Sequence, residues 1–153
     1  MKKIHKLVVL TVLTITLAGL TACSNRTPVS VSDFNEIMEE KGFEIVDATG
    51  QVAPESITAI SIAVNEDYQI ELYEMVSDAT ATAVFAENKD IFEGYAEGSS
   101  LTLSKSIMNY SYYSVTNDGT YYALSKVGNT MIYVVADAEY KDEISDILKE
   151  LGY

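Results

Sequence analysis

Strict alternation of apolar and polar residues predicts most of the strands in this chain. In the segment from Ile57 to Val64, one face collects Ile60, Ile62 and Val64. The other face collects the small residues Ala59, Ser61 and Ala63. Such alternation is typical of an antiparallel sheet with one well-buried face. Segments of this kind predict strands at Phe43–Ala48, Ile57–Val64, Tyr68–Val76, Leu101–Met108, Tyr110–Thr116, Tyr121–Val127 and Met131–Ala136.

Three other segments repeat their apolar residues at helical spacing, which gives each one apolar stripe. The first two segments begin at residues that can cap a helix, and a glycine follows each of the three. We expect a first helix between Ser32 or Asp33 and Gly42, a second between Ser77 or Asp78 and about Tyr95, and a third over Glu139–Leu151.

The predicted order is helix, three strands, helix, four strands, helix. This order favours an α+β fold: a twisted antiparallel sheet of about six to seven strands with three helices. We expect the helices to pack on one face of the sheet. Residues 31–153 are long enough for one such domain and too short for two.

The amino-terminal segment has the pattern of a signal peptide. Lys2, Lys3 and Lys6 precede an almost wholly apolar run, Leu7–Leu20. As a helix this run would extend about 21 Å, which is short of a bilayer core of about 30 Å. The segment 1–22 is therefore expected to direct export and then to be removed.

The signal segment ends in Leu20-Thr21-Ala22-Cys23, which resembles the lipobox of bacterial lipoproteins. The resemblance implies cleavage before Cys23 and a diacylglyceryl thioether, carrying fatty acids such as palmitate, on its sulfur. The alternative is an ordinary secretory signal with an incidental cysteine. Cys23 is the only cysteine, so an exported chain would otherwise carry one unpaired thiol.

The carboxyl-terminal third carries a second resemblance. Asn129-Thr130-Met131-Ile132-Tyr133, Tyr140-Lys141 and Leu151-Gly152-Tyr153 are similar to the ends of small lipoproteins of unknown function from Clostridia-type Gram-positive bacteria. The resemblance implies a location on the outer face of the cell membrane, anchored by lipid. It implies no activity.

The charge balance excludes one class of function. The chain has 10 Lys and Arg against 23 Asp and Glu, a net charge of −13, and loss of Lys2, Lys3 and Lys6 makes it −16. Nucleic-acid binding needs a cationic surface for phosphates, so no nucleic-acid partner is expected. The short linker 23–30 would keep the domain close to the membrane, and we expect a monomer.

The residue types left after export exclude several chemistries. The only histidine, His5, lies in the signal segment, so the mature chain has neither histidine nor a free thiol. Histidine-based catalysis and the usual zinc or copper sites need those groups. No phosphate-binding glycine motif is present, and Asn65–Asp67 and Asn117–Gly119 favour turns over calcium cages. We expect no catalytic residues, metal or cofactor.

Two functional hypotheses remain. The first is a non-catalytic, membrane-tethered binding module for an envelope protein or glycan. The second is a carboxylate-dependent hydrolase of cell-envelope material, which needs two acids at a suitable separation. Lys105 and Lys126 each interrupt an apolar alternation: they are either an anion-binding pair or side chains that reach neighbouring carboxylates, and we favour the latter.

The tyrosines give the one candidate partner surface. Asp118-Gly119 between alternating strands predicts a two-residue hairpin loop that pairs Asn117 with Thr120. In that register one face, the core face, collects Tyr113, Val115, Tyr122 and Leu124. The other face collects Tyr110, Tyr112 and Tyr121, and with helices on one side only these tyrosines would form an exposed strip, extended by Tyr73. The alternative is that a helix or loop covers the strip.

Overall fold

The computed structural model describes residues 25–51, 55–96 and 100–153. The predicted signal peptide and Cys23 lie outside these residues. The helices are α2 (Val31–Glu40), α3 (Asp78–Glu93) and α4 (Lys141–Glu150), with short 3₁₀ turns η1 (Thr49–Gln51) and η2 (Ala138–Tyr140). The strands are β1 (Glu44–Asp47), β2 (Ile57–Val64), β3 (Gln69–Met75), β4 (Leu101–Ile107), β5 (Tyr110–Asn117), β6 (Thr120–Val127) and β7 (Thr130–Asp137).

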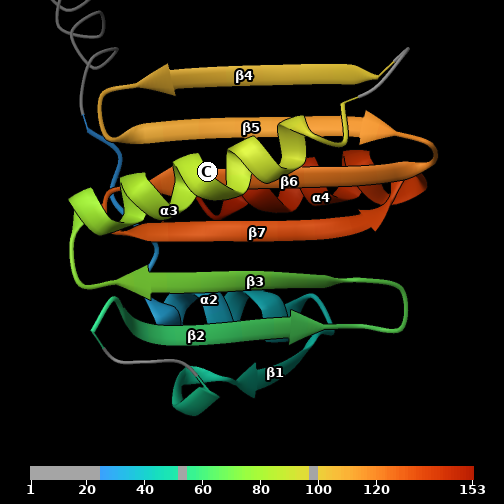
Figure 1. The fold of residues 1–153 in the computed structure, drawn as a ribbon. Helices are drawn as coiled ribbons and strands as arrows, with labels where there is room; N and C mark the ends of the chain where they lie inside the picture. Colours follow the sequence, from blue (N-terminus) through green and yellow to red (C-terminus); the bar gives the residue numbers. More distant parts are fainter. Residues whose placement is uncertain (1–24, 52–54, 97–99) are drawn as a thin grey trace, which may run out of the picture.

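The α+β fold and its order of elements are confirmed. The seven strands form one antiparallel sheet in the order β1-β2-β3-β7-β6-β5-β4 (Figure 1). Two meanders, β1–β3 and β4–β7, therefore lie side by side. They are joined where β3 pairs with β7, with Leu72 opposite Ile132.

The helices lie on both faces of the sheet, so the expectation of a single covered face is wrong. In Figure 1, α3 crosses in front of the sheet, while α2 and α4 lie behind it. The physical reason is visible in β6, which is buried along most of its length on both faces, and in the first part of β7, which is buried on both faces at Met131 and Ile132. A strand buried on both faces needs a covering layer on each side.

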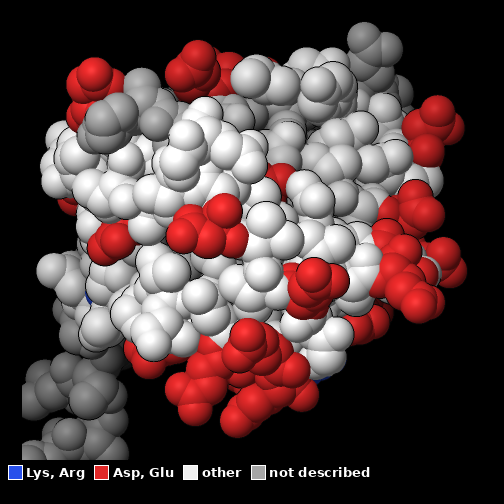
Figure 2. Space-filling model, turned by 90° about the horizontal axis from the view of Figure 1, so that it is seen from below, with Lys and Arg blue, Asp and Glu red and all other residues white. Residues whose placement is uncertain are grey.

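The surface is strongly acidic. Figure 2 views the molecule from the β1 edge and shows acidic side chains scattered over it, with hardly any Lys or Arg in view. This distribution agrees with the composition of the chain.

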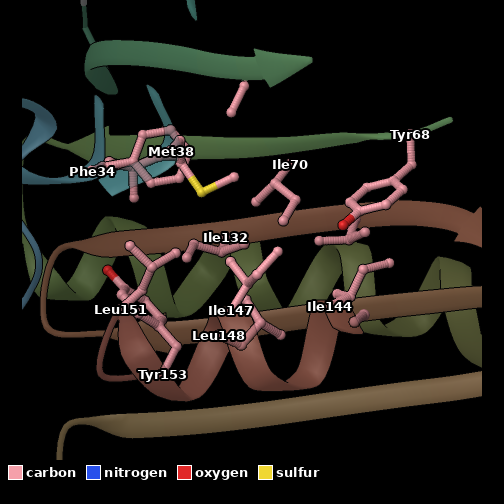
Figure 3. Packing of buried hydrophobic residues seen from close by; sticks show 14 of the residues in the cluster. Phe34, Met38, Tyr68, Ile70, Ile132, Ile144, Ile147, Leu148, Leu151 and Tyr153 are labelled. Atoms are coloured by element: carbon pink, nitrogen blue, oxygen red, sulfur yellow. The ribbon is translucent and has the colours of Figure 1, made fainter. Parts of the chain in front are cut away.

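The larger core lies between the sheet and the pair α2 and α4 (Figure 3). Phe34 and Met38 of α2 and Ile144 of α4 are fully buried in it, against Ile70 and Ile132 of the sheet. The smaller core lies under α3 and includes Phe85, Phe92, Tyr113 and Leu124. Two separate cores thus hold the sheet from its two sides.

The helix starts agree only in part with the prediction. Ser77 caps α3, because its hydroxyl accepts a hydrogen bond from the Thr80 N–H at 3.1 Å. The cap of α2 is Ser30 and not Ser32 or Asp33. The Ser30 hydroxyl accepts from the Asp33 N–H at 3.0 Å, so the helix begins earlier than the pattern indicated.

The predicted hairpin at Asp118-Gly119 is confirmed. Both residues have positive φ, 48° and 80°, and Asn117 pairs with Thr120. The register therefore places Tyr121 and Tyr122 on opposite faces, as the sequence predicts.

Candidate interaction surface

The predicted exposed strip of tyrosines is buried by α4. Tyr110 and Tyr121 are 7% and 1% exposed, and Tyr112 is half-buried. The hydroxyl oxygens of Tyr112 and Tyr121 lie 2.8 Å apart, which gives each a hydrogen-bond partner inside the protein. Because α4 packs on this face, these three tyrosines belong to the core and form no free surface.

Tyr73 lies on the opposite face of the sheet from the other three. Its neighbour Leu72 faces α2 and α4, so Tyr73 faces α3 together with Met131, its partner on β7. The sequence prediction placed the four tyrosines together because it lacked the pairing of β3 with β7.

The α3 face is the one that remains partly open. Helix α3 packs over β5, β6, β7 and the edge of β3, and on this face no helix covers β1 and β2, which α2 covers from the other side (Figure 1). A row of side chains crosses this open half: Val46, Ile62, Glu71 and Tyr133 are cross-strand neighbours. Val46 and the nearby Val135 are 41% and 37% exposed. Apolar side chains therefore face solvent beside α3.

A groove of about 420 Å³ runs between α3 and this open half of the sheet. It is partly open to solvent. Its floor and walls combine apolar, aromatic and polar side chains: Ile57, Glu71, Tyr73, Val84, Asn88, Met131 and Tyr133. Pockets of this composition bind ligands through apolar contact and a few oriented polar groups.

Glu71 is the polar centre of this groove, hereafter the α3 groove. Its carboxylate accepts hydrogen bonds from the Tyr73 hydroxyl and, at 2.6 Å, from the Gln69 amide nitrogen. Burial, and then the hydrogen bond to Glu71, raise the pKa of Tyr73. Burial followed by the Glu71 charge raises the pKa of Tyr133. Both hydroxyls therefore stay protonated, and the single hydroxyl hydrogen of Tyr73 is donated to Glu71.

An aromatic row continues from the α3 groove toward the end of α3. Tyr133 packs on Phe92 with ring centroids 5.2 Å apart, and Phe92 packs on Tyr122 at the same distance. Tyr122 stacks on Tyr95 at 4.9 Å, and Tyr95 is 45% exposed. Of this row Tyr95 is exposed, Tyr122 and Tyr133 are half-buried and Phe92 is buried. None of the four was predicted from the sequence to belong to a partner surface.

A second hollow is lined by acids whose carboxylates are all engaged within the protein. It contains Glu143, Asp146 and Glu150 of α4. Each carboxylate has a partner: the Tyr68 hydroxyl at 2.9 Å, Lys149 at 2.7 Å and Lys41 at 2.6 Å, respectively. In the part of the chain that the structure describes, no group of three acidic, histidine or cysteine side chains is placed to hold a metal.

Lys105 and Lys126 do not form a pair. Lys126 faces α3, is 3% exposed and donates to Asp78 at 2.6 Å, so the interpretation of a lysine that reaches a carboxylate is confirmed for this residue. Lys105 is exposed on the edge strand β4 and faces the α4 side. The two lysines lie on opposite faces of the sheet.

We compared the chain with protein-family models, with curated proteins and with solved structures, and none of the three comparisons gave a match. Within the described ranges, no helix combines the length and the apolar character that crossing a bilayer requires.

Proposed function

We propose that this protein is a lipid-anchored, extracytoplasmic binding module and that it does not act by catalysis. The observation that carries the proposal is the lipobox-like Leu20-Thr21-Ala22-Cys23 after a short apolar segment, in a chain with no other cysteine. In this proposal Cys23 carries the lipid, and residues 31–153 form the domain that it tethers at the cell membrane.

The α3 groove is the proposed partner site, and an envelope glycan is the ligand class that suits it best. Tyr73 and Tyr133 offer ring faces on which a sugar can stack, and Glu71 and Asn88 offer polar atoms for its hydroxyl groups. A protein partner is the other candidate of this class. No observation in the described residues favours the carboxylate-dependent hydrolase, since the acid-lined hollow is occupied by internal hydrogen bonds and ion pairs.

Anchoring is tested by growing cells with a fatty-acid probe and isolating the protein. The native chain should carry the probe, and the Cys23→Ser variant should not, because the acceptor thiol is gone. Labelled Cys23→Ser protein would refute the proposed anchor.

Ligand binding is tested by co-sedimentation with purified cell-wall glycan. Tyr133→Ser combined with Tyr73→Ser should reduce the bound fraction, because both stacking surfaces are removed. Tyr95→Ser is the matched control outside the α3 groove. Equal sedimentation of all three proteins would exclude the glycan, and release of soluble sugar by the native protein would support the hydrolase instead.

A further inference from the structure

The linker is tied to one corner of the domain. The main-chain N–H of Arg26 donates to the Asn109 side chain at 2.9 Å, and the Asn109 amide donates back to the Arg26 carbonyl at 2.8 Å. The Arg26 guanidinium also donates to the Gly152 carbonyl at 3.0 Å. Two residues, Ser24 and Asn25, lie between Cys23 and Arg26, and the three residue-to-residue steps give a reach of about 10 Å. A lipid on Cys23 would therefore hold the β4–β5 turn next to the bilayer.

That corner exposes apolar side chains. Ile107 and Met108, at the end of β4 and in its turn, are 53% and 62% exposed. Leu101 and Leu103 of the same strand are 64% and 60% exposed. Strand β4 is an edge strand with all seven residues exposed, and an edge of this kind is usually protected in some way.

Met108 is an unusual residue for its position. Its φ is 56°, in the left-handed region that bulky side chains rarely adopt. The corresponding tight turns of the neighbouring hairpins use Asp118-Gly119 and Gly128, which tolerate positive φ. The chain thus keeps a large apolar side chain at a strained turn. Strained residues of this kind cluster at functional sites.

The charge of the corner is opposite to that of the rest of the domain. Arg26 stacks on the Tyr110 ring at 3.5 Å, and the Lys105 amino group lies 5.9 Å from the same ring. Among the described residues neither cation has a carboxylate within 4 Å. The turns at the opposite end of the strands carry exposed acids at Glu66, Asp67, Asp118, Asp137 and Glu139. The end that holds the corner also carries exposed Glu55 and Asp78, and Asp78 is paired with Lys126.

We propose that the corner formed by Arg26, Lys105, Ile107 and Met108 rests on the headgroups of an anionic lipid bilayer. The proposal builds on the proposed anchor at Cys23 and adds the orientation of the domain. The two cations contact lipid phosphates, and the apolar side chains enter the interface. The acidic turns at the opposite end then point away from the negatively charged surface, which keeps the repulsion small although the domain carries a net charge of −16.

The native methionine is the reporter for the test. Met108 is exposed, whereas Met38, Met75 and Met131 are at most 2% exposed. The full chain is reconstituted in phosphatidylglycerol vesicles and treated with chloramine-T, a charged oxidant, and sulfoxide formation at each methionine is followed by mass spectrometry. Oxidation of Met108 should be several-fold slower in vesicles than in detergent. The methionine of a Glu66→Met variant, at the opposite end, should oxidise equally fast in both.

A matched pair of lysine variants tests the charge. Lys105 lies 5.9 Å from the Tyr110 ring, and Lys141, on α4, lies 6.0 Å from the Tyr121 ring. Lys105→Glu should restore fast oxidation of Met108 in these vesicles, and Lys141→Glu should leave the protection intact. Equal oxidation of Met108 in vesicles and detergent would overturn the proposal. Protection of Met108 that increases with protein concentration in detergent would also overturn the proposal, because it would indicate that a second copy of the chain covers β4.

The anchor itself is measured separately. The intact mass of the chain reports whether Cys23 is lipidated. If the thiol is free, the proposed anchor fails, and the thiol is then coupled to a maleimide-bearing lipid so that the same tether exists. The oxidation of Met108 then still decides whether the corner contacts lipid.

Discussion

The two faces of the sheet are built from alternate residues of the same strands, yet they differ in how completely they are closed. The face toward α2 and α4 gathers nineteen buried residues from among those described, whereas the α3 face gathers eight. Two helices cover the first face except at the exposed edge strand β4, and a single off-centre helix leaves part of the second face open. The difference separates a face that is mostly buried core from one that stays partly open to solvent and that we propose as the binding face.

Consecutive tyrosines of β6 give the strongest test of this difference. Tyr121 faces α4 and is 1% exposed, whereas Tyr122 faces α3 and is half-buried. We expect Tyr121→Ser to lower the free energy of unfolding by about 3–5 kcal/mol and Tyr122→Ser by about 1–2 kcal/mol. Urea titrations followed by circular dichroism measure both. Equal losses would mean that the two faces contribute alike.

The helices can be compared in the same way. Leu148 of α4 is 2% exposed, so Leu148→Ala should cost about 2–5 kcal/mol of unfolding free energy. Ile91 of α3 is 49% exposed, and Ile91→Ala should change stability by no more than about 0.5 kcal/mol. A loss below about 0.5 kcal/mol for Leu148→Ala would place α4 outside the core.

The α3 face has one buried charge whose partner can be removed. Asp78→Asn leaves the buried amino group of Lys126 without its carboxylate, and we expect a loss of about 1–3 kcal/mol. Asp33→Asn is the control, because Asp33 is the acid in the first turn of α2, as Asp78 is in α3. It measures the loss of the interaction between a first-turn acid and the helix dipole alone, about 0.3–1 kcal/mol. Adding Lys126→Met to Asp78→Asn should recover most of the loss. If it does not, the ion pair is not the cause.

The smallest expected effect lies at the edge of the sheet, beyond both cores. Met108→Gly should relieve the positive φ and raise the unfolding free energy by about 0.5–1 kcal/mol. Ile107→Gly, one position earlier in regular strand, should lower it by a similar amount, about 0.5–1 kcal/mol. A loss of stability in Met108→Gly would show that the methionine packs on the domain.

Local patterns were sufficient to predict the elements. Alternation in Ile57–Val64 and the Asp118-Gly119 turn depend on neighbours in sequence, and the strand and its hairpin register follow from them. Local patterns did not predict on which face of the sheet each helix packs, although the sequences of β6 and β7 indicated that both faces are covered. Tyr121 and Tyr122, like Ile132 and Tyr133, place apolar side chains on both faces, which is typical of a sheet covered on both sides.

The α3 groove could not be predicted, because it depends on a contact between distant segments. Glu71 and Tyr133 become neighbours only when β3 pairs with β7. No local pattern specifies that pairing. The tyrosine strip failed for a related reason, since its exposure depended on where α4 packs and not on the register of the hairpin, which was correct.

The junction of β3 with β7 also constrains when the sheet can be completed. Each meander is formed by hairpins between neighbouring strands, which close fast. The edge of β3, however, stays unpaired until β7 is available, and β7 ends at Asp137, close to the last residue, Tyr153. A chain that emerges amino terminus first therefore cannot complete its sheet until β7 has emerged. In the export that we propose, this late closure would keep the sheet incomplete while β1 to β6 cross the membrane.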